Sequence, residues 1–401
     1  MTEPHTSART TVVLAILFAG AFVMGCAEML VVGMIDLIAA DLAVSLSAAG
    51  ALVTANALGL AIGGPLLTFA LTRFDRRAVL LGAICAFILA NLVPVLTADY
   101  TLFVIARVVI GGVQGLFIAA AMVTATTVVP PQRAGRAMAL IIGGFAMSSA
   151  VGMPLGTLLG QAIGWRGSFA GVVAVGLVVL VIAFLVLPSV PASGEHRALG
   201  QARHAFAPRV LAVLGVSLLT FAAMLSAITY LIPFLDQVTG TTGAVATAYL
   251  LIYGVATAIG SFAGGRFADA NAALTLIVGA VGVGLSLTVL VVFGANPIVA
   301  GAAVFGVGLF GMGTGASIQH RVVSLAGPGA PLASSLPASA VNAGIALGAF
   351  AGGVALDSAG VVAAVVAGIA LAVLATGAAW ATSAVRPAAD LPAADRVQVA
   401  D

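Results

Sequence analysis

The chain has 401 residues, of which 62% are hydrophobic and only 7% are charged, and its formal net charge is +2. A soluble domain carries about 25% charged residues, so this composition excludes a soluble protein and predicts a membrane protein. The apolar segments are long and continuous, which favours membrane-spanning helices over the short strands of a barrel. The chain contains no lysine, which excludes the P-loop lysine of an ATPase.

Twelve apolar segments follow one another along the chain, each long enough to cross a bilayer. We therefore predict an all-α membrane protein whose transmembrane helices form two six-helix, pseudo-symmetric halves. The predicted spans are 11–38, 48–71, 78–97, 101–128, 135–161, 167–188, 209–235, 243–266, 272–294, 297–321, 331–356 and 359–384. The predicted divisions are a tail at 1–10, a bundle at 11–188, a linker at 189–208, a bundle at 209–385 and a tail at 386–401.

The arginines predict the orientation of these spans, because loops rich in arginine stay in the cytoplasm. With both termini inside, only Arg166 falls in an outer loop, while the other loop and tail arginines fall on the inner side. The outer loops instead carry aspartates. A shift by one span would destroy this asymmetry, so we expect both termini and the 189–208 linker to be cytoplasmic.

The first span carries a carboxylate, Glu28, near its middle. An ionisable group at that depth costs roughly 2.5–3.5 kcal/mol on insertion scales, and such groups are usually functional or paired. Asp36 adds a second acid about 12 Å further out along the helix. We take Glu28 as the main candidate for proton binding and Asp36 as its assistant.

The fourth span contains Arg107, roughly 9 Å inside its outer end. By depth this arginine falls between the two carboxylates of the first span. Burial favours a neutral Glu28 and a nearby cation favours the carboxylate, so the two effects oppose each other and would let Glu28 load and release a proton. Two alternatives remain open: Arg107 extends to the membrane interface, or Glu28 and Arg107 form a purely structural pair.

Two inner loops carry related motifs at corresponding places in the two halves. The loop after the second span reads TFALTRFDRR, with Arg73, Arg76 and Arg77, and the loop after the eighth contains Gly265 and Asp269. We consider these residues candidates for controlling conformation, with topology alone as the alternative.

The fifth span contains Gly152-Met-Pro154-Leu-Gly156. Proline removes a helical hydrogen bond and the glycines allow close packing, so we expect a bend here with a gating role. Two further glycine-spaced stretches begin at Asn56 and at Asn342, and we interpret both mainly as packing surfaces.

Together these motifs resemble those of the major facilitator superfamily over about residues 10–385, in particular its twelve-span drug–proton antiporter branch. Within that branch the chain is similar to the bacterial group of sugar, purine and chloramphenicol efflux permeases. The sequence departs from the branch where Thr68 and Thr72 replace a glycine and an aspartate of the inner-loop motif. The resemblance implies a bacterial cytoplasmic membrane protein that exports small molecules by alternating access, as a monomer coupled to protons.

The resemblance also implies that spans 1, 4, 7 and 10 line the substrate cavity. Methionine, aromatic and amide side chains suit a pliable pocket for amphipathic compounds. The candidates on these spans are Met24, Gln114, Phe117, Ser226, Tyr230, Phe310 and Gln319.

Two substrate classes remain open: amphipathic compounds such as antibiotics, which the apolar cavity favours, and polar metabolites such as sugars, nucleosides or amino acids. An intramembrane enzyme built on Ser317 and His320 is a remote alternative, because no glycine-flanked serine loop supports it. We therefore expect no catalytic residues, no cofactor or metal, and no nucleic acid among the partners, which are the substrate, protons and the bilayer.

Overall fold

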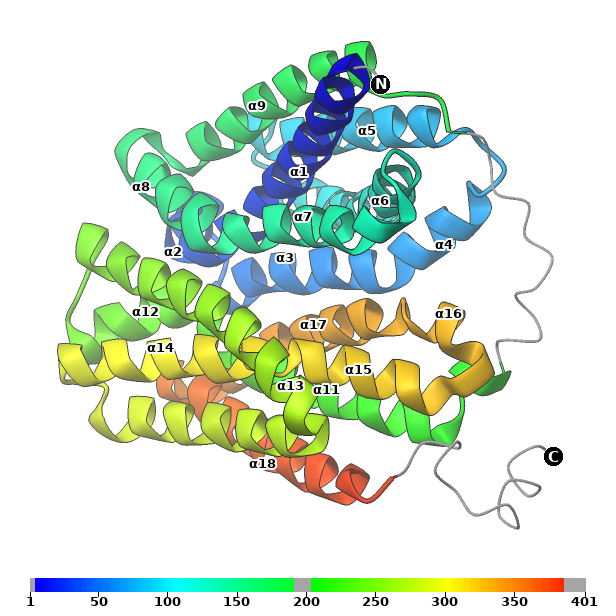
Figure 1. Cartoon of the computed structure of the whole chain (residues 1–401). Helices are drawn as coiled ribbons and strands as arrows, with labels where there is room; N and C mark the ends of the chain where they lie inside the picture. Colours follow the sequence, from blue (N-terminus) through cyan, green and yellow to red (C-terminus); the bar gives the residue numbers. More distant parts are fainter. Residues whose placement is uncertain (1–3, 191–202, 386–401) are drawn as a thin grey trace. The chain divides into compact units, whose positions relative to one another are not determined.

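The computed structural model describes residues 4–190 and 203–385, and every regular element within these ranges is helical (Figure 1). The predicted 189–208 linker falls largely, the predicted tail at 1–10 partly, and the predicted tail at 386–401 wholly outside the described residues. The amino-terminal part contains α1 (Pro4–Gly33), α2 (Ile35–Asp41), α3 (Leu46–Leu58), α4 (Gly64–Ala70), α5 (Arg76–Leu96), α6 (Tyr100–Thr127), α7 (Ala134–Met147), α8 (Met153–Ile163) and α9 (Trp165–Val186). The carboxy-terminal part contains α11 (Pro208–Ile228), α12 (Leu231–Phe234), α13 (Gly243–Phe293), α14 (Pro297–Gly313), α15 (Gly315–Ala326), α16 (Ala330–Ala333), α17 (Leu336–Ala359) and α18 (Val361–Ser383).

Among the described residues, eleven helical segments are long and apolar enough to cross a membrane, and α13 contains two crossings. Its 51 residues would extend about 76 Å, more than twice the ~30 Å hydrocarbon core of a bilayer. Asn271 within it has φ −160° and ψ 90°, which is not helical and separates the two crossings. The described chain thus accounts for the twelve predicted spans.

Three of the first six predicted spans are interrupted along their length. Met34 has φ −132° and ψ 25° and separates α1 from α2. A π-helical turn at Gly59–Gly63 separates α3 from α4, and another at Ser148–Gly152 separates α7 from α8. A proline follows shortly after each π-helical turn, where its missing N–H would leave a gap in the regular hydrogen-bond ladder.

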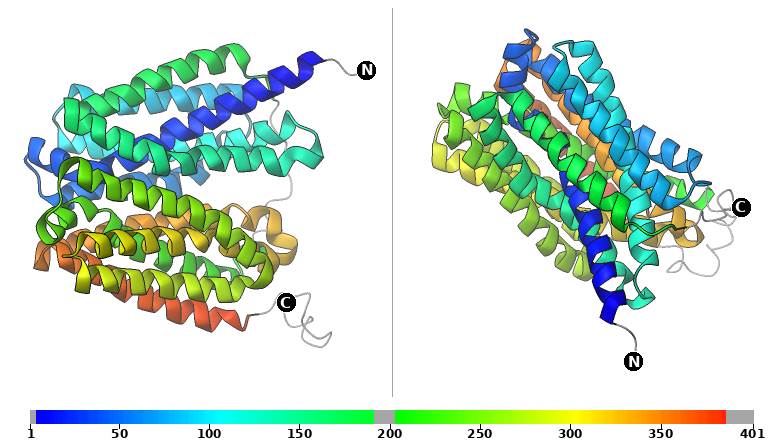
Figure 2. Two further views of the ribbon diagram at one scale, coloured as in Figure 1. Left: turned by 60° about the vertical axis from the view of Figure 1, so that its left-hand side comes forward. Right: turned by 90° about the horizontal axis from the view of Figure 1, so that it is seen from above.

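The chain forms two compact units. The first unit contains α1 to α9, α12 and the part of α13 up to Gly254. The second unit contains α11, the remainder of α13 and α14 to α18. Within each unit the long helices lie lengthwise against one another (Figure 2). The predicted six-plus-six division of the chain remains a prediction.

In the first unit, glycines let α6 touch the second span backbone to backbone. A Cβ at Gly111 would lie 2.0 Å from the Asn56 carbonyl oxygen, and one at Gly59 would lie 2.2 Å from the Val108 carbonyl oxygen. Neither glycine could therefore carry a side chain without moving a helix. The packing role predicted for the stretch beginning at Asn56 is confirmed.

In the second unit, α17 contacts α11 in the same way. A Cβ at Gly344 would lie 2.4 Å from the Leu218 carbonyl oxygen, and one at Gly348 would lie 2.3 Å from the Ala222 carbonyl oxygen. The packing role predicted for the stretch beginning at Asn342 is also confirmed.

Large apolar side chains cover the outer surface of the helices. Phe69 is 74% exposed, Phe262 is 84% exposed and Trp380 is 72% exposed. Such a surface is stable only against lipid, since in water it would drive aggregation.

Candidate functional site

Glu28 lies in the interior of the first unit, on α1, and only 2% of its surface is exposed. Its Oε2 atom accepts a hydrogen bond of 2.6 Å from Nε2 of Gln114 on α6. Gln114 is fully buried, and its own Oε1 has no hydrogen-bond partner among the described residues. The carboxylate is therefore held by one amide, whose acceptor atom is left free.

Arg107 is fully buried too, two helical turns before Gln114 on the same face of α6. Its three guanidinium nitrogens each donate to a main-chain carbonyl: Nη1 to Ala27 at 2.8 Å, Nη2 to Glu28 at 3.3 Å and Nε to Leu52 at 3.2 Å. Arg107 does not extend to the membrane interface, and no ion pair joins it to the Glu28 side chain within the described residues. It binds the backbones of α1 and α3 and leaves its charge next to the carboxylate.

The Gly152–Gly156 motif of the fifth span packs against α1 on both sides of Glu28. A Cβ at Gly152 would lie 2.2 Å from Sγ of Cys26, and one at Gly156 would lie 2.0 Å from Cδ2 of Leu30. Pro154 between them is buried. The glycines of this motif thus set how closely α8 approaches the turns of α1 that carry the acid.

Asp36 lies apart from this cluster. It belongs to α2, beyond the break at Met34, and its side chain is exposed. All three nitrogens of Arg107 are occupied by other partners, so the structure does not bring Asp36 and Arg107 together.

The candidate substrate residues divide between the two units. In the first unit, Met24 and Phe117 are each 1% exposed, and Phe117 packs on α1 where Gly20 leaves room for its ring. Gln114 binds Glu28 as described, and Tyr230 is 1% exposed with its hydroxyl against Gly50 of α3. Of these four side chains only Gln114 contacts the acid of the first span; Phe117 packs on α1 at Gly20, and Tyr230 packs on α3.

The remaining candidates lie in the second unit. Ser226 is buried and donates to the Ala364 carbonyl oxygen at 2.6 Å, and Phe310 packs against Gly282 of α13. Gln319 is exposed and donates to the Ser334 carbonyl oxygen at 3.1 Å. These three side chains are engaged in the second unit's own packing and are not brought together.

One polar residue in the interior was missed as a site candidate. Asn56 is 1% exposed, one turn after Leu52 on α3, and neither polar atom of its side chain has a hydrogen-bond partner among the described residues. A buried polar group without a partner costs about 1–3 kcal/mol. In the sequence Asn56 precedes Gly59, Gly63 and Gly64, and this spacing indicated a packing surface. Only the lack of a hydrogen-bond partner marks Asn56 as a candidate for contacting substrate or water.

The inner-loop arginines of the first unit join the loop to the end of α9. Arg77 Nη2 donates to the Phe184 carbonyl oxygen at 2.7 Å, and the Arg76 main-chain N–H donates to the Val190 carbonyl oxygen at 3.0 Å. Arg73 is exposed and lies over the ring of its neighbour Phe74.

Asp75 completes this loop. It caps α5 by accepting from the main-chain N–H groups of Arg77 and Ala78, and its other oxygen accepts from the Ser189 hydroxyl at 2.5 Å. The Ser189 hydrogen bond is the largest of the effects that hold the pKa of Asp75 below its usual value. In the second unit Asp269 is exposed and Gly265 has open space around it.

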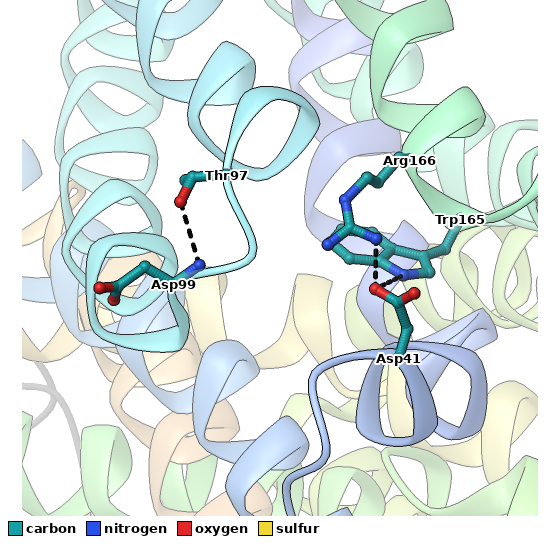
Figure 3. Close-up of polar contacts among 5 residues, drawn as sticks. All are labelled: Asp41, Thr97, Asp99, Trp165 and Arg166. Atoms are coloured by element: carbon teal, nitrogen blue, oxygen red, sulfur yellow. Dashed lines mark hydrogen bonds and ion pairs between the residues drawn. The ribbon is translucent and has the colours of Figure 1, made fainter.

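A separate cluster joins α2 to the start of α9 (Figure 3). Asp41 forms an ion pair with Arg166 and accepts a hydrogen bond of 3.2 Å from the indole N–H of Trp165. The Arg166 guanidinium lies 4.4 Å from the centre of the Trp165 ring, which stacks on Phe103. Arg166, the single arginine predicted for the outer loops, is thus paired with an aspartate that is also predicted to lie on the outer side. These contacts hold α2 against the start of α9.

Helical spans that hold buried ionisable groups between closely packed helices are typical of polytopic membrane transporters. The family model described as "Major Facilitator Superfamily" matches residues 17–331. The chain belongs to this superfamily, and the family expected from the sequence motifs is confirmed.

Named relatives agree with this assignment. The chain is 34% identical to the "Inner membrane transport protein YdhP" of Escherichia coli (strain K12), over 84% of this chain and 87% of that protein. It is 30% identical to the "Chloramphenicol resistance protein" of Streptomyces lividans, over 81% of this chain and 84% of that protein. Its fold is similar to that of a bacterial homolog of the human lysosomal transporter Spinster, whose crystal structure is inward-facing and unoccupied. The TM-score is 0.77 and the identity 15%, and the match covers 96% of this chain and 98% of that chain.

Proposed function

We propose that this transporter exports small amphipathic compounds, such as antibiotics, in exchange for protons, and that Glu28 carries the proton. The observation that carries the proposal is a buried carboxylate that has an amide as its partner instead of a cation. The nearby Arg107 spends its hydrogen bonds on main-chain carbonyls, so it attracts the carboxylate without neutralising it in an ion pair. Such a group can bind a proton without breaking a salt bridge.

Gln114 suits a proton-linked switch because an amide both donates and accepts. With Glu28 ionised, Nε2 of Gln114 donates to the carboxylate. With Glu28 protonated, its O–H needs an acceptor, and the unpartnered Oε1 of Gln114 serves once the amide turns over. Gln114 would then support both protonation states, in addition to the substrate contact expected from the sequence.

Coupling follows if substrate and proton compete for the same cavity. Met24, Phe117 and the unpartnered Asn56 are buried on α1, α6 and α3 of the same unit as Glu28, and they would offer apolar surface and one free amide once a cavity opens there. Substrate arriving there would favour release of the proton in one orientation, and proton binding would favour release of the substrate in the other. The relative named as a chloramphenicol resistance protein favours an amphipathic drug as substrate.

We further propose that alternating access uses the fifth-span motif at Gly152, Pro154 and Gly156 and the inner-loop residues Arg73, Arg76, Arg77, Gly265 and Asp269. The contacts of Gly152 and Gly156 with α1 support this, because a shift of α8 would be transmitted to the turns beside Glu28. Asp36 would assist from α2, where it is open to solvent. The protein would act as a monomer in the bacterial cytoplasmic membrane with both termini inside.

The test is efflux of a compound panel from cells that express the wild type, Glu28→Gln or Asp36→Asn, with the proton gradient intact or collapsed. We expect gradient-dependent efflux that Glu28→Gln reduces at least about tenfold at equal protein level, in line with the effect of removing a group that transfers a proton. Asp36→Asn tests the assisting role and should retain at least about half of the activity. Undiminished efflux in Glu28→Gln would contradict the proton-carrier role.

A panel that includes sugars, nucleosides and amino acids separates the two substrate classes. Efflux of apolar drugs alone would support the amphipathic class. Efflux of the polar metabolites alone would replace it with the polar class and leave the role of Glu28 to be read from the same variants.

A further inference from the structure

A cavity of about 210 Å³ lies in the second unit, apart from the proposed proton carrier, where the two crossings of α13 meet α15 and the end of α18. Its walls are lined by Asn271, Ala272, Ala273, His320, Arg321, Ser324, Leu325 and Val385. The described residues of this lining include two basic side chains and no acid. The volume is several times the ~30 Å³ that a water molecule occupies in the liquid, so a small oxyanion fits.

Arg321 is the first feature that indicates an anion. Only 7% of its surface is exposed, although it carries a full charge. One terminal nitrogen, Nη2, donates to the carbonyl oxygens of Thr382 at 2.6 Å and Val385 at 3.3 Å. Its buried Nε has no hydrogen-bond partner among the described residues, and no ion pair within them neutralises its charge. A buried cation with an unused donor lining a cavity is half of an anion site.

The start of a helix is the second feature. Asn271 has non-helical backbone angles, and its Oδ1 accepts from the main-chain N–H of Leu274 at 3.0 Å, as an N-cap does. The crossing that follows runs to Phe293, so its positive dipole end lies at Ala272 and Ala273. Both alanines line the cavity and present no side chain that would fill it.

His320 adds an adjustable donor. Its side chain is exposed and lines the same cavity beside Arg321. Imidazole can donate to an anion in either charge state, and more strongly when protonated. The cavity thus combines a buried guanidinium, an imidazole and a helix start, which is the set of groups that proteins use to bind phosphate.

We propose that this cavity binds a phosphate group, either that of an anionic phospholipid or a free phosphate. It lies on the side of the membrane that the arginine distribution predicts to be cytoplasmic, where anionic headgroups are within reach. Occupation would hold the start of the second α13 crossing, α15 and the end of α18 together through one ligand. The site is independent of the proposed proton carrier, which lies in the other unit.

The test uses the purified full-length chain in a neutral detergent and native mass spectrometry. One arm adds short-chain phosphatidylglycerol with phosphatidylcholine as the uncharged comparison, and the second adds inorganic phosphate and records thermal stabilisation. We expect the wild type to bind phosphatidylglycerol in preference to phosphatidylcholine, or to be stabilised by inorganic phosphate. Arg321→Gln should weaken that binding about tenfold, the typical effect of losing a charged hydrogen-bond donor.

Arg321 also donates to carbonyl oxygens at the end of α18, so a loss of binding in Arg321→Gln could reflect misfolding of the protein. His320→Glu therefore serves as the second variant, since it places a negative charge in the cavity at an exposed position. Gln132→Glu, an exposed position in the first unit, is the matched control and should bind like the wild type.

The two measurements identify whether the ligand is a lipid or a free phosphate, and they can also show that the cavity binds neither. Binding of phosphatidylglycerol alone would assign the site to lipid, and stabilisation by inorganic phosphate would assign it to a soluble ligand. Binding of neither probe, or binding that His320→Glu leaves unchanged, would overturn the proposal. Because efflux is not measured, its failure is separate from failure of the transport mechanism.

Discussion

Arg107 connects three backbone carbonyls from two helices, and this explains why a full charge can be buried at membrane depth. Each of its nitrogens has a partner, so the cost of removing the guanidinium from water is partly offset by charged hydrogen bonds. The carbonyl of Glu28 is one of these partners, and the side chain of the same residue binds Gln114. At the scale of the residue, the arginine therefore holds the backbone at the acid, and the carboxylate keeps Gln114 as its partner.

The first prediction concerns Arg107→Lys, which keeps the charge but has one nitrogen instead of three. A single ammonium cannot reach carbonyls on both α1 and α3 in the same geometry, so about 2–5 kcal/mol of stability should be lost, as for broken buried charge contacts. Thermal unfolding in detergent measures this, with the exposed Arg136→Lys as the control. An unchanged unfolding temperature for Arg107→Lys would mean that these contacts contribute little.

The second prediction concerns Asn56→Leu, which replaces an amide without partners by an apolar side chain of similar size. Folding stability should stay within about 1 kcal/mol of the wild type or increase, because no hydrogen bond is lost within the described chain. Efflux should nevertheless fall several-fold if the amide contacts substrate. Unfolding and efflux measured on the same preparation separate the two effects, and a stability loss above about 2 kcal/mol would contradict the absence of a partner.

At the scale of the element, glycines decide which helices are neighbours. The hydrocarbon interior of a membrane supplies no hydrophobic force between helices, so close backbone contact has to supply the packing energy. In the first unit this contact joins α6 to the second span, and it joins the fifth span to α1 beside Glu28. The elements that hold the acid are thus positioned by residues that carry no side chain.

The third prediction tests one of these contacts with Gly111→Ala. The added Cβ would lie 2.0 Å from the Asn56 carbonyl oxygen, so the helices must separate and about 1–3 kcal/mol or more should be lost. Gly143→Ala is the matched control, because no neighbouring atom lies within 4 Å of the position that its added Cβ would take. Equal unfolding temperatures for the two variants would contradict the tight contact.

The fourth prediction concerns the loop in which Ser189 donates to Asp75. The folded pKa of Asp75 is lowered, so the stabilisation from this contact is complete above the ordinary aspartate pKa near 3.9 and is lost as the pH falls through the folded value. The wild type should therefore be slightly more stable than Ser189→Ala at about pH 6, and the difference should shrink below about pH 4. A difference that grows in acid would have the wrong sign for this contact.

At the scale of the whole molecule, the exposed surface of the described helices is apolar and the charges gather at the helix ends. The ion pair of Asp41 with Arg166 lies at the start of α9, where that helix meets α2. The inner loops instead carry arginines bound to helix-end carbonyls, as Arg77 is to Phe184. This separation is what an oriented membrane protein requires.

The fifth prediction tests the orientation with single cysteines in a Cys26→Ala, Cys85→Ala background. Ala98→Cys lies between α5 and α6 and should react with a membrane-impermeant maleimide in intact cells. Gln132→Cys lies between α6 and α7 and should react only after the membrane is opened. Both positions are exposed, so accessibility differs only by side. The reverse pattern would place the termini outside.

The sequence by itself determined the family, the helical class and the twelve crossings. These follow from local properties, namely the length of the apolar runs, the sign of the loop charges and motifs that are short in sequence. Most helix ends agree with the predicted spans to within a few residues. The breaks inside the spans, such as those at Met34 in the first and Thr314 in the tenth, were not predicted, because backbone bending inside an apolar run leaves no signal in its hydropathy.

Only the tertiary structure decided which of the buried polar groups bind one another. Depth alone places Arg107 between Glu28 and Asp36, whereas its contacts are with carbonyls and Asp36 lies on a separate short helix. Gln114 as the partner of Glu28, Asn56 as an unpartnered amide and the cavity at Arg321 are likewise visible only in three dimensions. The reason is physical: a hydrogen bond depends on the rotation of each helix about its axis to within about an ångström, and a pattern of residue types does not specify that rotation.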